Sequence, residues 1–418
     1  MMNKRLHRLL CVTLFLPLIV CVSCKKGGPG QDKHTETPME FYSDGRDFFT
    51  ADYALYHSNH GRLQFFDVSD KKDIVYCFDS GCEHKQEKRN PYTAETIEKG
   101  CIAYKNSADS VMLRGDEMYF FEDDGDVVVA DRQGENRRVI ATIPFYKLGL
   151  KNVLYSEDKM VICYSSDIEF VETVDENGRS AVYVTGKNSA ESDCGVYCIN
   201  LSDGAVSEVF HNRGYNGRLF YCDIRDNHLY FVFYYWSIPY IGSDLDTNGL
   251  DVEIPEGLTK ENYWEESRKY QWMDVYDVDL GTNTVRTILS HIPSGTVEFC
   301  RGFFAVEEWE KGATGLYRYD GERFRQLDFE MRTGYRSDSG LICTDSAETG
   351  SYRLIDENTG EIRRQVSVSN NTMLPKVFIG GSCYGYMAGP KGWHLGYISE
   401  EDFWNGDFSK AIPFNAIE

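Results

Sequence analysis

The sequence predicts an all-β protein that folds as a β-propeller of seven blades, with six or eight blades as alternatives. Three observations support this fold. No long amphipathic helix pattern occurs, a short unit of strands and turns recurs, and the turn glycines Gly281, Gly321 and Gly360 follow one another at intervals of about 40 residues. Such a period is typical of a four-stranded propeller blade. Two packed sandwiches, the other arrangement for a large all-β chain, do not account for this period.

The recurring unit consists of an apolar and aromatic strand, a second strand that ends in Asp, a turn with Gly, and a third strand with basic or polar alternation. One copy runs from Met118 through Asp131 and Gly134 to Ile140. Asp-Gly and Asn-Gly turns between such strands are typical of hairpins. Further copies occur at 195–210, 229–288, 303–327, 341–366 and from 383 onward, with an N-terminal blade at 49–77.

The spacing of the earlier turn glycines indicates insertions. The intervals from Gly134 to Gly204 and from Gly204 to Gly281 are each nearly twice the later period. We therefore expect the propeller to span 41–418, with insertions at about 78–105 and 237–271. Long loops on a rigid scaffold often carry function, so the insertion at 237–271 is the preferred candidate for a binding surface.

The N-terminus has the pattern of an export signal. Three basic residues, Lys4, Arg5 and Arg8, precede an apolar run at 9–20, which is too short to span a membrane. The following Cys-Val-Ser-Cys resembles a bacterial lipobox, although a cysteine stands where the pattern usually has Leu. We therefore expect 1–23 to be a lipoprotein signal peptide and 24–40 to be lipidated Cys24 with a flexible tether, and plain secretion is the alternative.

The charge balance narrows the choice of partners. The chain has 44 Lys and Arg against 66 Asp and Glu, which gives a net charge of −22. Such an acidic chain is repelled by phosphate backbones, so we expect no nucleic-acid partner. The expected location is the extracytoplasmic face of the cell membrane or outer membrane, where the lipid anchor holds the protein.

Ten of the 13 cysteines lie outside the signal peptide and the lipidation site. An extracytoplasmic location favours disulfides, and we expect one to three bridges. Several other cysteines lie in short apolar runs, where a free thiol serves as a small core residue. If Cys194 and Cys198 share one strand they are about 13 Å apart, beyond the reach of a disulfide.

One cluster of cysteines has the spacing of a metal site. Cys77 and Cys82 are followed by His84 and, further along, by Cys101, and Gly81 permits a tight turn between them. Three thiols and one imidazole are a donor set for closed, tetrahedral Zn²⁺. One disulfide with a spare cysteine and an exposed histidine is an alternative, and free thiols are another. In each case we expect a structural role, in which the loop 78–100 is held against the propeller.

Residues 244–253 read D-x-D-x-N-G-x-D-x-E, which is how a Ca²⁺ loop begins. The candidate ligands are Asp244, Asp246, Asn248, Asp251 and Glu253. Pro255 occupies the position where an EF-hand has its bidentate Glu, so the stretch is not an EF-hand. The alternative is a solvated acidic turn, because Asp, Asn and Gly are ordinary turn residues.

Aromatic residues gather in and beside the insertion at 237–271. Exposed aromatic rings stack on sugars or anchor protein partners. The candidates for ligand binding are Trp236, Tyr240, Tyr263 and Trp264. Packing between blades is the alternative role for these side chains.

The chain resembles bacterial extracytoplasmic propeller lipoproteins and, more distantly, TolB-like and low-density-lipoprotein-receptor-type propellers. The resemblance covers roughly 41–418. It rests on the lipobox, the recurring unit, and the stretch from Cys77 to His84 with the later Cys101. It implies the fold and an extracytoplasmic location, and it implies no ligand.

Motifs of catalysis are missing from the sequence, which has no H-E-x-x-H, G-x-S-x-G, P-loop or dinucleotide glycine fingerprint. We therefore expect no catalytic residues and a non-enzymatic binding module for an extracellular glycan or partner protein. One alternative is a glycan hydrolase or lyase with two carboxylates about 5–10 Å apart at the propeller centre. Another is a structural subunit of an envelope complex, which predicts a large exposed apolar patch.

Overall fold

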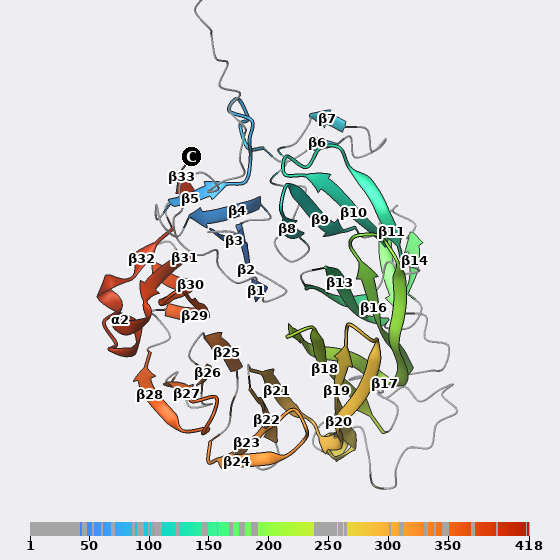
Figure 1. Cartoon of the computed structure of the whole chain (residues 1–418), viewed down its shortest axis with the longest axis vertical. Helices are drawn as coiled ribbons and strands as arrows, with labels where there is room; N and C mark the ends of the chain where they lie inside the picture. Colours follow the sequence, from blue (N-terminus) through green and yellow to red (C-terminus); the bar gives the residue numbers. More distant parts are fainter. Residues whose placement is uncertain are drawn as a thin grey trace, which may run out of the picture.

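The protein is an all-β propeller, with six sheets of four or more strands arranged around a common centre (Figure 1). The computed structural model describes residues 42–417 apart from 44–47, 52–53, 60–61, 68–71, 86–87, 90–95, 99–100, 102, 104–110, 123–124, 144–148, 157, 167–169, 175–179, 185–190, 238–256, 258–261, 263–265, 301, 309–312, 330, 332, 338–339, 345–350, 369–372, 390–391 and 415. Every neighbouring pair of strands within the six sheets is antiparallel except one. The expected fold class is therefore confirmed.

The first two sheets come from the N-terminal part of the chain. The first contains β1 (Tyr42–Ser43), β2 (Phe48–Ala51), β3 (Ala54–Asn59), β4 (Arg62–Asp67), β5 (Lys72–Val75) and the C-terminal β33 (Ala416–Ile417). The second contains β8 (Val111–Arg114), β9 (Glu117–Phe121), β10 (Asp126–Asp131) and β11 (Arg138–Thr142). A small hairpin of β6 (Lys88–Arg89) and β7 (Thr96–Glu98) lies between them in sequence.

The third sheet has seven strands: β12 (Gly149–Tyr155), β13 (Lys159–Ser166), β16 (Glu191–Asn200), β17 (Val206–Arg225), β18 (His228–Trp236), β19 (Gln271–Asp279) and β20 (Thr284–Pro293). The hairpin of β14 (Phe170–Val174) and β15 (Ser180–Val184) is inserted between β13 and β16. Each of the last three sheets has four consecutive strands. The fourth sheet contains β21 (Gly295–Phe299), β22 (Phe304–Glu308), β23 (Ala313–Tyr317) and β24 (Arg323–Leu327), and the fifth contains β25 (Thr333–Ser337), β26 (Gly340–Thr344), β27 (Ser351–Ile355) and β28 (Ile362–Ser367). The sixth contains β29 (Met373–Ile379), β30 (Ser382–Gly389), β31 (Gly392–Ser399) and β32 (Ile412–Pro413).

The prediction of seven blades is wrong, because two of the recurring units share one continuous strand. The 20-residue β17 pairs with β16 through its first half and with β18 through its second half, and Tyr215 has a partner on both sides. Register shifts bend β17 where it pairs with β18. Residues of both halves of the sheet, Cys163, Val196 and Phe231 among them, form one apolar cluster. Two expected blades are thus a single seven-stranded sheet in a ring of six.

The hydrophobic core is a series of apolar clusters between neighbouring sheets. Tyr56 and Phe65 of the first sheet, for example, pack with Met118 and Phe120 of the second. Each sheet has neighbours on both faces, so strands such as β9 are buried on both sides. This is why strands such as β9 and β10 read as continuous apolar runs, since only a half-buried strand requires alternation.

The Asp at the end of a recurring strand closes the turn that follows it. Asp279 Oδ1 accepts hydrogen bonds from the backbone N–H groups of Gly281 and Thr282, at 2.7 and 3.1 Å, and these bonds lower the pKa of its carboxyl group. The turn after Asp356 has the same arrangement, and Asp131 likewise accepts two backbone N–H groups of the turn that follows it. The recurring Asp is thus explained by Asx-turn chemistry.

The same turns connect neighbouring sheets. Arg318 donates hydrogen bonds to the carbonyl oxygens of Glu357 and Asn358, at 3.2 and 2.7 Å, in the turn between β27 and β28. Its guanidinium also lies 4.0 Å from the centroid of the Phe324 ring. Arg325 of β24 donates to the carbonyl oxygen of Thr359 at 2.9 Å. Arginines of one sheet therefore satisfy the turn carbonyls of the next.

The ring is closed by the C-terminus. β33 pairs in parallel with β5, through Ala416 with Asp73 and Ile417 with Ile74, so the last strand joins the first sheet. In Figure 1, β33 lies beside β5 at the rim, and β1 lies toward the centre. The ring of Phe414 stacks on that of Phe66 with centroids 4.2 Å apart, within an apolar cluster shared by the first and last sheets.

Helical structure is minor. It consists of α2 (Glu400–Trp404) and the 3-10 turns η3 (Ser267–Tyr270) and η4 (Phe408–Lys410) in the part of the chain that the structure describes. The Ser399 hydroxyl caps α2 by accepting a hydrogen bond from Asp402 N–H at 3.1 Å. No helix among the described residues combines the length and the apolar character needed to cross a membrane.

We predict that Gly204→Ala destabilises the protein more than Gly115→Ala. Both glycines have positive φ, 72° and 55°, so both substitutions introduce backbone strain of about 1 kcal/mol. A Cβ at Gly204 would also overlap the carbonyl oxygen of Ile140 in the second sheet, whereas one at Gly115 meets nothing within 4 Å. The extra cost is about 1–3 kcal/mol. Urea unfolding measures both variants, and equal losses would contradict the close approach of the two sheets.

We also predict that stability falls at alkaline pH. Burial, and then the nearby Asp277 carboxylate, raises the pKa of Tyr230 to about 12, against about 10 in an unfolded chain. The phenol therefore contributes its full stability below about pH 10 and loses it as the pH rises toward 12, because the unfolded state releases its proton first. Tyr230→Phe should flatten the fall in unfolding free energy between about pH 10 and pH 12 while leaving the value at pH 8 close to wild type. An unchanged slope would contradict this explanation.

Candidate metal centre

Four of the predicted site residues converge in space. The ligand atoms of Cys77, Cys82, His84 and Cys101 all lie within 4.8 Å of one another. Cys101 is buried and the other three are half-buried. Three of the four sulfur and nitrogen ligands come from one short segment after β5, and the fourth arrives from beyond the β6–β7 hairpin.

The segment after β5 is shaped by its own hydrogen bonds. Asp79 makes a turn, in which its Oδ1 accepts from Gly81 N–H at 2.9 Å and its carbonyl oxygen accepts from Cys82 N–H at 3.1 Å. Gly81 itself lies outside the left-handed region, so the turn does not depend on a glycine there. The positive φ of 50° falls at His84 instead, and it turns the chain back toward the sulfurs.

Cys101 is tied to this segment through the backbone and the side chain. Its N–H donates to the carbonyl oxygen of Lys85 at 2.8 Å, and its Sγ lies 3.6 Å from Nδ1 of His84. Tyr76, which directly precedes the site, is fully buried and donates its hydroxyl to the carbonyl oxygen of Arg132 at 3.0 Å. The cluster is thus anchored to both the first and the second sheet.

Two of the sulfurs accept backbone hydrogen bonds. His84 N–H donates to Cys82 Sγ, and Ala103 N–H donates to Cys101 Sγ, each at 3.4 Å. Burial raises the pKa of the Cys77 thiol. Burial, with smaller contributions from the Cys77 and Cys82 thiols, raises the pKa of Cys101 to about 12. Without a cation, the thiols of Cys77 and Cys101 are therefore protonated at neutral pH.

The expectation of one to three disulfides is wrong for the described cysteines, because none of the nine whose side chains the structure describes forms a disulfide. Besides Cys101, five of them are buried at less than a tenth exposure in or beside the apolar clusters: Cys163, Cys194, Cys198, Cys300 and Cys383. They pack there as small apolar residues. Cys194 and Cys198 both lie on β16, so their local bond is excluded by the length of an extended strand.

The other predicted sites fall largely outside the described residues. Cys24, the calcium candidates Asp244, Asp246, Asn248, Asp251 and Glu253, and the aromatic residues Tyr240, Tyr263 and Trp264 all lie there. Trp236 is described at the end of β18, where it is 4% exposed. Its indole is therefore part of the interior and offers no open stacking face.

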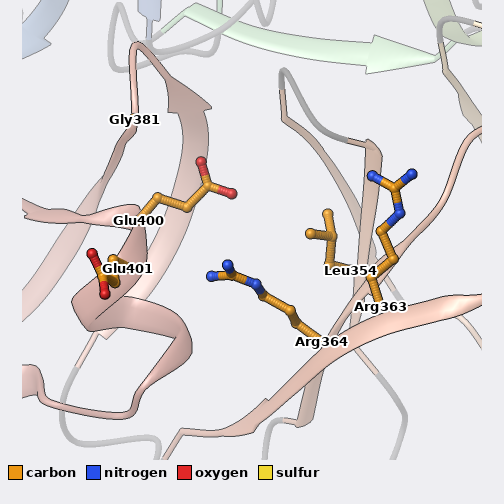
Figure 2. Close-up of a pocket in the computed structure, with 6 residues that line it drawn as sticks. All are labelled: Leu354, Arg363, Arg364, Gly381, Glu400 and Glu401. Carbon is orange, nitrogen blue, oxygen red and sulfur yellow. The ribbon is translucent and has the colours of Figure 1, made fainter.

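Sequence reasoning did not single out an open, charged pocket between the last two sheets. Its lining residues are Leu354, Arg363, Arg364, Gly381, Glu400 and Glu401, around a volume of about 470 Å³. Figure 2 shows Arg364 extended toward Glu400 and Glu401, whereas Arg363 forms an ion pair with Asp356. The pocket thus contains acidic and basic side chains together, and one of its arginines is paired with an acid outside the lining. The sequence signal for this pocket was two pairs of adjacent like charges, Arg363 with Arg364 on β28 and Glu400 with Glu401 on α2.

Comparisons with known proteins identify no family. No protein-family model and no curated protein matches the chain. Among solved structures, dipeptidyl peptidase 4 of Porphyromonas gingivalis is 11% identical with a TM-score of 0.46, and the match covers 87% of this chain and 48% of that one. Oligogalacturonate lyase of Vibrio parahaemolyticus is 7% identical with a TM-score of 0.47, over 89% and 93% of the two chains. Puromycin hydrolase is 11% identical with a TM-score of 0.47, over 91% and 53%.

This chain spans about half the length of the peptidase and of the hydrolase that it matches. At such low identities the likeness concerns the propeller fold alone.

Proposed function

We propose that this protein is a membrane-anchored, extracytoplasmic β-propeller that binds a glycan or a partner protein and carries out no chemistry on it. The N-terminal sequence carries the proposal, because three basic residues, the apolar run at 9–20 and Cys24 precede the propeller in that order. The lipid on Cys24 would hold the ring at the extracytoplasmic face of the cell membrane or outer membrane.

The closed ring favours a binding role. Its last strand belongs to its first sheet, so the turns and loops at its ends are held on a frame whose first and last sheets are joined. A ligand that binds such a frame orders few side chains and loses little affinity to conformational entropy. This argument supports binding and does not name the ligand.

The buried aspartates support a role without catalysis. Asp223 pairs with Arg225 at 2.6 Å, and Asp277 pairs with both His228 and Arg286 at 2.7 Å. Asp73 and Asp356, the other buried aspartates among the described residues, have a histidine and an arginine as partners. A glycosidase requires two carboxylates that face one substrate, and each of these acids faces a basic side chain instead.

The exposed apolar surface gives little support to a structural subunit. Among the described residues, six large apolar side chains are exposed: Val139, Val206, Val285, Ile362, Leu374 and Ile412. Each lies on a different strand, and single exposed apolar residues are normal on soluble surfaces. A docking face for a permanent partner requires a contiguous patch.

We predict that Cys24→Ser abolishes lipid attachment. Bacteria that express the full chain are grown with a clickable fatty acid, and the label on the protein is compared between variants and between membrane and soluble fractions. The wild type and Cys21→Ser should be labelled and sedimentable, because Cys21 precedes the cleavage site, whereas Cys24→Ser should lose both properties. Equal labelling of Cys24→Ser would remove the anchor from the proposal.

Binding without turnover is tested with immobilised polysaccharides. The purified chain should be retained by at least one neutral or acidic polysaccharide of the panel, and the eluted material should contain no new reducing ends and no unsaturated uronate. Release of either product would instead support the glycan hydrolase or lyase.

A further inference from the structure

We propose that Cys77, Cys82, His84 and Cys101 bind one Zn²⁺ ion in a closed tetrahedral site that fixes the exit from the ring-closing sheet. The observation that carries this inference is the convergence of all four ligand atoms within 4.8 Å. The inference is independent of the lipid anchor and of ligand binding, because its residues lie in neither.

The spacing fits a metal better than a disulfide. Tetrahedral Zn²⁺ with Zn–S near 2.3 Å and Zn–N near 2.1 Å places its ligands roughly 3.5–3.8 Å apart. The distance from Cys101 Sγ to His84 Nδ1 is 3.6 Å. A disulfide would join two sulfurs at about 2.05 Å and leave the third sulfur and the imidazole without a function.

The donor set selects the ion. Three thiolates and one imidazole are soft ligands, which favour Zn²⁺ over the oxygen-preferring Ca²⁺ and Mg²⁺. Four protein ligands fill the tetrahedron, so no position remains for water or substrate, and the site is structural. The remaining charge is −1, and the backbone N–H groups of His84 and Ala103, which point at two of the sulfurs, stabilise it.

The position of the site gives the ion its role. Cys77 lies just after the end of β5, and β5 is the strand to which the C-terminal β33 is added. Cys101 precedes β8 and the second sheet, and the β6–β7 hairpin lies in the loop between His84 and Cys101. Figure 1 shows this hairpin at the rim, next to the second sheet. The ion therefore closes this loop. It fixes the connection from β5 to β8, next to the strand pair that closes the ring.

The first test measures metal in the full chain purified in detergent without added metal. Elemental analysis should find about one zinc per chain. Cys82→Ala, which removes a half-buried ligand, and Cys101→Ala should lose most of it. Cys300→Ala is the matched control, because Cys300 is 5% exposed and Cys101 is 4% exposed, yet Cys300 lies in the cluster around Phe303. The control should retain its zinc.

A second test uses Co²⁺ as a spectroscopic probe. After removal of zinc by chelator, the wild type and Cys300→Ala should bind one Co²⁺ with thiolate-to-metal charge transfer and the intense visible bands of tetrahedral cobalt. Cys82→Ala should lose a thiolate contribution even if its fold is intact. Chelator should also lower the thermal midpoint of the wild type, since metal that binds only the folded state adds stability.

Peptide mapping under non-reducing conditions gives one result that overturns the proposal. This result is a zinc-free chain in which two of Cys77, Cys82 and Cys101 form a stoichiometric disulfide. Equal zinc content in Cys101→Ala and in the wild type would place the ion elsewhere and would also overturn the assignment.

Discussion

The architecture depends on the pairing of its last strand with its first sheet. A ring of sheets is stable only when every interface is filled, and the interface between first and last sheets can form only after the whole chain has been gathered. The parallel pair of β33 and β5 joins the two ends, and the stacked rings of Phe66 and Phe414 fill the space beside it. The closing contacts therefore join residues near opposite ends of the chain, and they bear a large loop-closure entropy.

A polar pair is buried at the same junction. The imidazole Nε2 of His57 lies 2.8 Å from Asp73 Oδ1, and both side chains are at most 2% exposed. The His57 ring is also 5.4 Å from that of Phe414. Polar groups buried together cost little as long as both are present, whereas loss of one leaves the other without its partner. The junction thus combines apolar packing with a directional bond that favours one register of β5.

The features that the sequence predicted are those decided by local chemistry. Asp131, Asp279 and Asp356 end strands and accept the N–H groups of the next turn, so the repeat is visible wherever Asp precedes a turn. The number of blades was not predictable in this way. Whether β17 breaks after Tyr215 or continues into the next unit depends on its partners β16 and β18, and those pairings are not local.

The same distinction between local and non-local chemistry separates the candidate metal centre from the buried polar pair. Cys77, Cys82 and His84 lie close together in the sequence, so their proximity follows from one turn, and the sequence marked them as a group. The bond between His57 and Asp73, which lie on different strands, follows from strand register and carried no signal of its own. The expectation of disulfides failed because a buried cysteine packs as well as a small apolar residue does, and composition does not distinguish the two roles.

The closed ring also makes the order of the chain partly arbitrary. The two terminal strands lie at opposite edges of one six-stranded sheet, β1 at one and β33 at the other. Five inter-strand steps separate them, or roughly 24 Å, which about eight extended residues can bridge. A circularly permuted chain with such a linker could begin at any connection between sheets and still form the same contacts. A new terminus within β17 would cut a strand that pairs with both β16 and β18. We therefore expect a permuted chain to tolerate a start between two sheets but not within β17.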